Sequence, residues 1–255
     1  MTSSIRPIAL ITGGSRGLGR NTALNLARRG ADVIVTYRSR ADEAEAAVAE
    51  IEAAGGRAAA LELDAGAVAT FPAFVEALKK TLRETWQRDR FDYLVNNAGT
   101  GLRKMIAETT EEEFDTLMNT HLKGVFFLTQ ALLPLINDGG RIINISSGLA
   151  RFAAPGSSAY AMMKGGIEVF TRYLAKELGA RGITANTVAP GAIATDFNGG
   201  HVRDNAEINR MVAGVTALGR TGVPDDIGPM IASLLSDDNR WVNAQRIEAS
   251  GGMNI

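Results

Sequence analysis

Short β-branched runs alternate with longer segments of helical period along the whole of this 255-residue sequence. Seven runs have the apolar, β-branched character of buried strands: PIALIT, DVIVTY, AALEL, YLVN, RIINIS, ITANTVA and QRIEA. The helical segments between them begin near Gly17, Ala41, Phe71, Glu111, Ser158 and Pro224. This β-α-β-α series predicts an α/β fold, a doubly wound parallel sheet of seven strands with helices on both faces.

The chain shows no linker, internal repeat or low-complexity block, so we expect residues 1–255 to form a single domain. The stretch 191–221 departs from the regular alternation because it is long and rich in Gly and Asn. In open α/β sheets, ligands bind beyond the carboxyl ends of the strands. This stretch follows the sixth predicted strand, and we therefore expect it to be a lid over a substrate site.

The composition excludes several function classes. The chain has no cysteine, which excludes disulfides, thiolate catalysis and thiolate metal sites, and its two histidines do not suffice for a His-rich metal site. A formal charge of -1 gives no basic surplus for nucleic acid or anionic lipid. We recognise neither a signal peptide nor a run of about 20 apolar residues, and we expect a cytoplasmic protein.

A Gly-rich turn, TGGSRGLGR, follows the first predicted strand. Gly13, Gly17 and Gly19 lie between strand and helix, where missing side chains let backbone N–H groups approach a pyrophosphate. Glycines also occur in tight turns for steric reasons alone. The spacing G-x-x-x-G-x-G differs from the common G-x-G-x-x-G, but the strand–turn–helix context favours a dinucleotide site.

The end of the second predicted strand indicates which dinucleotide binds. NAD sites of this kind usually carry an acidic residue there, whereas a 2′-phosphate is bound by Arg. Here Tyr37 stands at that position, Arg38 follows it, and Arg16 lies in the glycine turn. Either arginine alone is an ordinary solvated side chain, but together they favour NADPH over NADH.

Six motifs occur in a fixed order: TGGSRGLG at 12–19, Asp64 closing the third strand, NNAG at 96–99, NISS at 144–147, YAMMK at 160–164 and PGAIAT at 190–195. Over essentially its whole length the chain resembles the short-chain dehydrogenase/reductase family, including 3-oxoacyl carrier-protein reductase-like and carbonyl reductase members. The resemblance implies a Rossmann-like fold and these cofactor-binding residues: Gly13, Ser15, Arg16, Gly17, Leu18, Gly19, Tyr37, Arg38, Asp64, Ala65, Asn97, Ala98, Gly99, Tyr160, Lys164, Pro190, Gly191, Ile193 and Thr195.

The resemblance also implies the chemistry. Tyr160 matches the residue that protonates a carbonyl oxygen as hydride arrives from the nicotinamide, and Ser147 matches the residue that hydrogen-bonds that oxygen. A free Tyr has a pKa of about 10. Lys164, one helical turn beyond Tyr160, supplies a positive charge that lowers this pKa, and it also reaches the ribose.

One position departs from the family pattern. His121 stands where the family commonly has an Asn that joins a water relay to the Lys. Three interpretations remain: the relay runs through the backbone carbonyl, His121 itself carries the proton, or catalysis is impaired. We favour the first, because Ser147, Tyr160 and Lys164 are all present.

The predicted substrate pocket is mostly apolar. Its candidates by position are Leu149, Phe152, Phe197, Met211 and, less strongly, Met105. These residues suit a medium-sized carbonyl compound, either free or bound to an acyl carrier protein. Arg181 could face such a carrier, but the NDGG loop predicted before the fifth strand places the acidic Asp138 there, so a carrier is not favoured.

The segments 111–135 and 158–178 are apolar on more than one face, which predicts a homodimer or homotetramer. The leading hypothesis is an NADPH-dependent carbonyl reductase. One alternative is a cofactor-binding regulatory or scaffold protein whose catalysis is impaired by His121. The other is an NAD-dependent alcohol dehydrogenase, for which Arg16 and Arg38 would be irrelevant.

Overall fold

The computed structural model describes residues 6–255, which contain one parallel sheet of seven strands in the order β3-β2-β1-β4-β5-β6-β7. The strands are β1 (Ile8–Ile11), β2 (Asp32–Tyr37), β3 (Ala58–Glu62), β4 (Phe91–Asn96), β5 (Ile136–Ile145), β6 (Thr184–Pro190) and β7 (Arg246–Ala249). The main helices are α1 (Gly17–Arg28), α2 (Ala41–Ala53), α3 (Phe71–Trp86), α4 (Glu111–Met118), α5 (Gly124–Leu132), α6 (Ser158–Glu177) and α9 (Gly228–Leu234). The predicted doubly wound α/β fold is confirmed.

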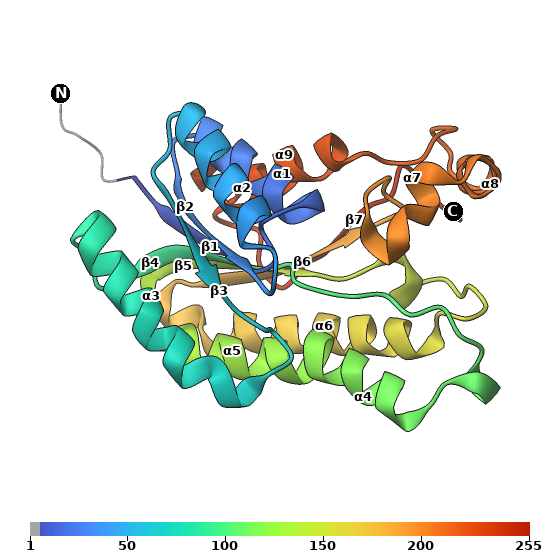
Figure 1. The fold of residues 1–255 in the computed structure, drawn as a ribbon, viewed down its shortest axis with the longest axis horizontal. Helices are drawn as coiled ribbons and strands as arrows, with labels where there is room; N and C mark the ends of the chain where they lie inside the picture. Colours follow the sequence, from blue (N-terminus) through green and yellow to red (C-terminus); the bar gives the residue numbers. More distant parts are fainter. Residues whose placement is uncertain (1–5) are drawn as a thin grey trace.

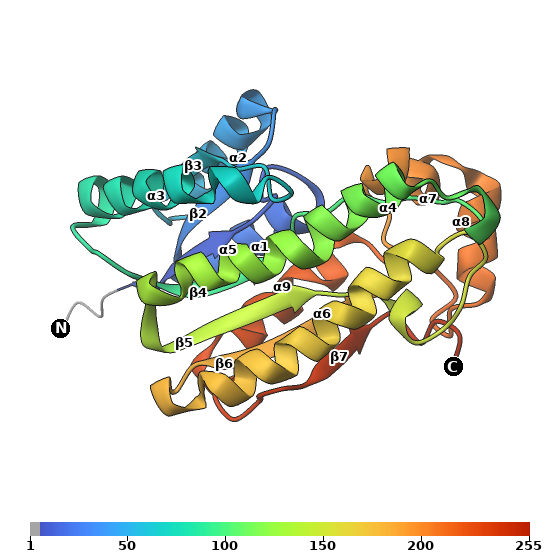
Figure 2. The same ribbon diagram turned by 90° about the horizontal axis from the view of Figure 1, so that it is seen from below.

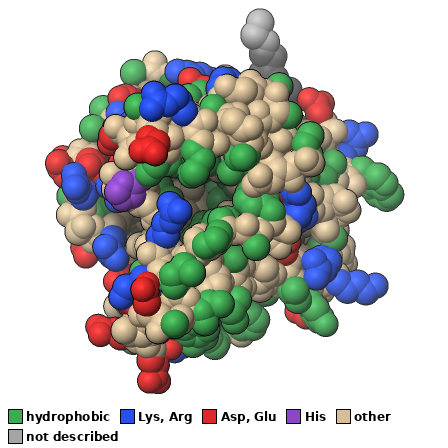
Figure 3. Space-filling view, turned by 90° about the vertical axis from the view of Figure 1, so that its right-hand side faces the viewer, with side chains coloured by type: hydrophobic (Ala, Val, Ile, Leu, Met, Phe, Trp, Pro, Cys, Tyr) green, Lys and Arg blue, Asp and Glu red, His purple; other side chains and the backbone are tan. Residues whose placement is uncertain are grey.

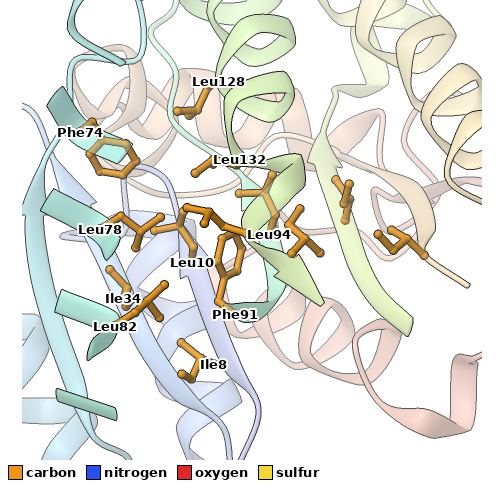
Figure 4. Packing of buried hydrophobic residues seen from close by; sticks show 14 of the residues in the cluster. Ile8, Leu10, Ile34, Phe74, Leu78, Leu82, Phe91, Leu94, Leu128 and Leu132 are labelled. Carbon is orange, nitrogen blue, oxygen red and sulfur yellow. The ribbon is translucent and has the colours of Figure 1, made fainter. Parts of the chain in front are cut away.

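Helices cover both faces of the sheet, with α1, α2 and α9 above it and α3, α5 and α6 below it in Figure 1. Successive strand residues point to opposite faces. In β1, Ile8 and Leu10 pack with α3 and α5, whereas Ala9 and Ile11 pack with α1 and α9. Figure 4 shows the lower layer, where Leu10 and Leu94 of the sheet meet Leu78 of α3. Because both faces are covered, β1 and the centre of β2 are continuous apolar runs.

The predicted helix over 111–135 is interrupted. A capping box between Thr110 and Glu113 starts α4, and the chain then forms a π-helical turn at Asn119–Lys123 before α5. A β-carbon at Gly124 would overlap the carbonyl oxygen of Ala65, so the helix passes close to the loop after β3. His121 lies in this π-helical turn, and its side chain is buried.

The NDGG segment is part of β5 and is not the loop that its turn-forming residues predict. Gly139 has a positive φ of 77°, and the pairing of β5 with β4 shifts register between Phe91 and Tyr93. The glycine therefore permits an irregularity within the strand.

The stretch 191–221 contains two short helices, α7 (His201–Asp204) and α8 (Ala206–Gly214). Asn198, Gly199 and Gly200 before them all have positive φ, a conformation that Asn and Gly tolerate best. The Asn205 side chain caps α8 by accepting from the N–H groups of Glu207 and Ile208. The Gly and Asn residues thus form turns and caps around helices that composition alone does not reveal. No helix among residues 6–255 has the length and apolar character needed to cross a membrane.

Candidate active site

The predicted site residues gather at the carboxyl edge of the sheet, beside the point where β1 and β4 are neighbours and the winding direction reverses. Figure 3 faces this edge and shows a hollow surrounded by hydrophobic side chains, with charged side chains on one side. The loops after β1, β4, β5 and β6 all end here, and helices α7 and α8 lie at this end of the molecule (Figure 1).

Two threonines fix the Gly-rich turn to the neighbouring strands. The Thr12 hydroxyl accepts from the backbone N–H groups of Asn97 and Ala98, both at 2.9 Å. The Thr36 hydroxyl accepts from the N–H of Gly13 at 3.2 Å. The Asn97 side chain donates to the carbonyl oxygens of Thr12 and Gly13, at 2.9 and 3.0 Å, so its amide positions the turn.

The turn has the form that a pyrophosphate requires. Gly13 and Gly17 have φ of 63° and 55°, and a β-carbon at Gly19 would overlap the Gly13 carbonyl oxygen. The helix α1 begins at Gly17 with no capping side chain and no acidic residue in its first turn. An uncapped helix start whose N–H groups face an open edge is suited to bind an anion, so these residues fit the phosphates of a dinucleotide.

The two predicted 2′-phosphate ligands have different surroundings. Arg38 is exposed directly after Tyr37, at the end of β2. The Arg16 guanidinium forms an ion pair of 2.6 Å with Asp196, a residue in the loop after β6. To bind a phosphate, the Arg16 guanidinium must therefore either break its ion pair with Asp196 or contact both anions at once.

The other predicted cofactor residues lie at the same edge. The Asp64 carboxylate accepts from the N–H of Gly66 at 2.9 Å, so it also stabilises a turn after β3, which ends at Glu62. Gly191 follows β6 so closely that an added β-carbon would lie 2.9 Å from Ser250. Ile193 forms a parallel bridge with Gly222, and the Thr195 hydroxyl accepts from the N–H of Phe197 at 3.2 Å.

Ser147, Tyr160 and Lys164 are brought together from β5 and α6. The Ser147 hydroxyl follows β5 and accepts from the N–H of Leu149 at 3.2 Å. Burial raises the pKa of Tyr160, while the Ser147 side chain opposes that shift. The phenol is therefore protonated at neutral pH, as a proton donor must be.

Lys164 lies beneath the Tyr160 ring, with its Nζ atom 5.5 Å from the ring centroid. Its ammonium is buried and donates to the carbonyl oxygen of Ile145 at 2.8 Å. Burial lowers its pKa from 10.5 to about 7. Charged and neutral Lys164 are thus close in free energy near neutral pH.

His121 fills the space between the loop after β4 and Tyr160. Its ring meets the Tyr160 ring edge-on, with centroids 5.2 Å apart and an interplanar angle of 85°. Its Nε2 atom lies 2.6 Å from the Thr100 carbonyl oxygen, while its Nδ1 atom is buried with no hydrogen-bond partner among residues 6–255. Burial, followed by the charge of Lys164, lowers the pKa of His121 from 6.5 to about 3, so the imidazole is neutral.

The predicted pocket residues are less uniform. Phe152 packs over Gly148, where an added β-carbon would lie 2.7 Å from its ring, and Leu149 lies in the same turn. Phe197 is exposed, with its ring centroid 6.2 Å from that of Tyr160. Met105 and Met211 are more than half exposed.

Several residues that hold the site were not predicted from the sequence. Thr36, Thr100 and Asp196 are single polar residues in loops or at strand ends, and they carry no recognisable pattern. Glu168 of α6 and Arg246 of β7 were not predicted either. The Ser146 hydroxyl donates to Glu168 at 2.8 Å, and Arg246 donates to the Ser147 carbonyl oxygen at 3.3 Å. Each of these contacts joins residues far apart in the sequence, so no local signal identifies them.

Known proteins resemble this chain along nearly its whole length. The family model described as enoyl-(acyl carrier protein) reductase matches residues 13–254. A hydroxynaphthalene reductase-like protein of Metarhizium brunneum is 37% identical, and the alignment covers 96% of this chain and 94% of that protein.

Two solved structures are similar in fold and sequence. The promiscuous reductase LugOII, described as catalysing keto-reduction at C1 during lugdunomycin biosynthesis, has a TM-score of 0.93 at 40% identity, covering 99% of this chain and 100% of that chain. The angucycline C-6 ketoreductase LanV with bound NADP has a TM-score of 0.93 at 37% identity, covering 98% of this chain and 96% of that chain. The fold, the ordered motifs and these matches agree, and the chain belongs to the short-chain dehydrogenase/reductase family.

Proposed function

We propose that the protein is an NADPH-dependent reductase that converts a ketone or aldehyde carbonyl to an alcohol. The observation that carries this proposal is the convergence of Ser147, Tyr160 and Lys164 at the carboxyl edge of the sheet, next to a glycine turn that fits a dinucleotide. Bound NADPH would supply the hydride.

In this proposal the chain's own residues donate a proton to the substrate carbonyl oxygen and hydrogen-bond that oxygen. Ser147 and Tyr160 donate hydrogen bonds to the carbonyl oxygen and stabilise the negative charge that develops there. Tyr160 then transfers its phenolic proton to that oxygen, which completes the alcohol, and is reprotonated from solvent. The positive charge of Lys164 stabilises the phenolate in between, and its pKa of about 7 allows it to pass on a proton near neutrality.

The choice of NADPH has two supports. Tyr37 stands at the end of β2 where an acidic residue would favour NADH, Arg38 is exposed directly after it, and Arg16 lies in the glycine turn. In addition, the solved relative LanV, at 37% identity, contains bound NADP. Arg16 supports NADPH less strongly than Arg38 does, because its guanidinium is engaged with Asp196.

For the substrate we propose a free ketone on an aromatic ring system. The rings of Tyr160, Phe197 and Phe152 offer flat apolar surface beside the catalytic hydroxyls. The relative from Metarhizium brunneum is named for hydroxynaphthalene, a fused pair of aromatic rings. An acyl carrier protein is not favoured, since the Arg181 guanidinium is engaged with Asp138 at 2.8 Å and with two backbone carbonyls rather than being free to pair with an acidic carrier.

The neutral state of His121 bears on the alternatives. A group whose pKa is about 3 is a poor proton carrier at neutral pH, which argues against transfer through an imidazolium. The impaired, regulatory alternative predicts NADPH binding without turnover. The NAD-dependent alcohol dehydrogenase predicts that Arg38→Ala leaves NADPH affinity unchanged.

We also propose a homo-oligomer and a lid. Five large hydrophobic side chains are exposed on α5 and α6, which lie side by side in Figure 2: Phe126, Phe127, Met162, Val169 and Tyr173. A second copy of the chain would cover this face. Residues 191–221 would close over the substrate, and the positive-φ run beginning at Asn198 would be the hinge.

The test is NADPH oxidation, followed by absorbance, against aromatic, cyclic and aliphatic ketones, with Tyr160→Phe as the paired variant. We expect turnover by the wild type and a loss of at least about 10³-fold in Tyr160→Phe, with the Kd for NADPH unchanged. NADPH binding without turnover of any ketone, restored by His121→Asn, would replace the reductase with the regulatory alternative. Gel filtration of the same sample measures the oligomeric state.

A further inference from the structure

Two arginines beside the substrate hollow take no part in the proposed mechanism, yet both bind the same carboxylate. Arg151 lies in the segment that follows Ser147, Arg246 lies on β7, and Glu248 on β7 accepts hydrogen bonds from both. Their side chains have exposed fractions of 39%, 24% and 17%, so the group lies at the edge of the interior. Exposed ion pairs contribute little, but a network of partly buried contacts that includes a bidentate pair has defined geometry.

Arg246 holds the beginning of the segment 147–152. Its Nη2 atom donates to the Ser147 carbonyl oxygen at 3.3 Å, its Nη1 atom donates to Glu248 at 2.8 Å, and its Nε atom donates to Glu168 at 2.7 Å. Glu168 in turn accepts from the Ser146 hydroxyl at 2.8 Å. The guanidinium therefore contacts the backbone of the residue that, in the proposed function, binds the substrate oxygen.

Arg151 holds the end of the same segment. Its Nε and Nη2 atoms donate to the two oxygens of Glu248, at 2.8 and 2.7 Å, which is a bidentate pair. Its Cζ atom lies 5.4 Å from the centroid of the Phe152 ring, so the guanidinium also packs on the predicted pocket residue. It donates further to the carbonyl oxygens of Met253 and Asn254, which connects the segment to the C-terminal residues.

We propose that Glu248 is a positioning residue for the substrate: through Arg246 and Arg151 it fixes both ends of the segment 147–152, and with them the Ser147 hydroxyl and the Phe152 ring. The roles of Ser147 and Phe152 in this statement rest on the proposed function. Hydrogen bonds from Arg151, followed by those from Arg246 and Ser250, hold the pKa of Glu248 at about 2, so the carboxylate is charged at all working pH values.

The contacts predict that the two arginines affect different kinetic constants. Loss of the Arg246 contact frees the Ser147 backbone and should lower kcat, because the hydroxyl stabilises charge that develops in the transition state. Loss of the Arg151 contact frees Phe152 and should raise KM, because the ring binds substrate and transition state alike. Glu248→Gln removes the charge that both guanidiniums share, so it should affect both constants.

The experiment uses Glu248→Gln, Arg246→Lys and Arg151→Lys in the full-length protein, with Arg88→Lys as the matched control. A Lys keeps the positive charge but cannot reproduce the several directed contacts of a guanidinium. Arg88 is a comparably exposed guanidinium that binds one carboxylate, Asp92, and one backbone carbonyl, at the opposite edge of the sheet. The readouts are amide hydrogen exchange of residues 149–152 without cofactor, kcat and KM for the best ketone of the panel, and the Kd for NADPH.

We expect Glu248→Gln to speed exchange in 149–152 by about tenfold and to lower kcat/KM by at least about tenfold, with the NADPH Kd unchanged. Arg246→Lys should act mainly on kcat, Arg151→Lys mainly on KM, and Arg88→Lys on neither. Unchanged exchange in all three variants, or a loss of kcat/KM matched by Arg88→Lys, would overturn the proposal. If Glu248→Gln does not fold, the two Lys variants decide.

Failure of the proposed function gives a different result. In that case the wild type oxidises no NADPH with any ketone, while faster exchange at 149–152 in Glu248→Gln still demonstrates the attachment of the segment. Turnover by the wild type with unchanged exchange and kinetics in the variants leaves the reductase standing and removes the role of Glu248.

Discussion

The neutral, buried imidazole of His121 makes the stability of the protein depend on pH in a way that one substitution removes. The pKa of His121 is about 3 in the native state, because burial and the charge of Lys164 both disfavour the imidazolium, and 6.5 in a solvated chain. Between these pH values the unfolded chain binds a proton at this position and the folded protein does not. Proton binding by the unfolded chain therefore costs the folded state almost nothing well above pH 6.5. This cost grows as the pH falls toward 3.

The size of the effect follows from these two values. At pH 7 about a quarter of the unfolded chains carry a proton on His121, and the cost to folding is about 0.2 kcal/mol. At pH 5 nearly all of them do, and the cost is about 2 kcal/mol. We therefore expect the wild type to lose about 2 kcal/mol more than His121→Asn between pH 7 and pH 5, whatever the packing cost of the substitution at pH 7.

Urea unfolding at pH 7 and pH 5 measures this difference directly. The chain has only two histidines, and His201→Asn is the matched control because His201 is exposed. Proton NMR of the two imidazoles gives a second readout, with the two variants assigning the signals. An equal pH dependence in wild type and His121→Asn, or a His121 signal that titrates near pH 6.5, would refute the reasoning and reopen proton transfer through the imidazolium.

Four further substitutions test other parts of the site. Arg38→Ala should raise the Kd for NADPH by about 10- to 100-fold without changing that for NADH, measured by nicotinamide fluorescence. Asp196→Asn releases Arg16 and should tighten NADPH binding by about threefold, because the pair that it breaks is largely exposed. Gly19→Ala brings a β-carbon onto the Gly13 carbonyl oxygen and should abolish NADPH binding and lower the free energy of unfolding by about 2 kcal/mol. Asn144→Ala breaks buried hydrogen bonds of 2.8 and 2.9 Å and should lower the free energy of unfolding by about 3 kcal/mol, measured in urea.

The sequence predicted the strands and most helix starts well because both depend on local information. Buried parallel strands are continuous apolar runs, and α1, α2, α3, α4 and α6 begin at the expected residues. The break in the segment 111–135 was not predictable in the same way. The π-helical turn at Asn119–Lys123 accommodates close packing of Gly124 against the loop after β3, which is a tertiary contact.

The site residues also divide into those that local sequence identifies and those that depend on tertiary contacts. Tyr160 and Lys164 were identifiable because they lie one turn apart on a predicted helix, and Ser147 was identifiable because it matches the family motif NISS after a predicted strand. Spacing could not show that Arg16 pairs with Asp196, a contact that spans 180 residues. Nor could it show that Asn97 acts on the Gly-rich turn through its side chain, since that contact depends on β1 and β4 being neighbours.

The cofactor and substrate halves of the hollow are held by separate sets of contacts. The cofactor half depends on hydrogen bonds among residues near the ends of β1, β2 and β4, in which Thr12, Thr36 and Asn97 bind backbone groups of the Gly-rich turn and its neighbours. The substrate half depends on ion pairs that join the segment after β5 to β7, with Glu248 at their centre. Because these sets share no residue, a change in one should leave the other intact. Substitutions around Glu248 should therefore alter which ketone is reduced, and how fast, while the affinity for NADPH stays constant.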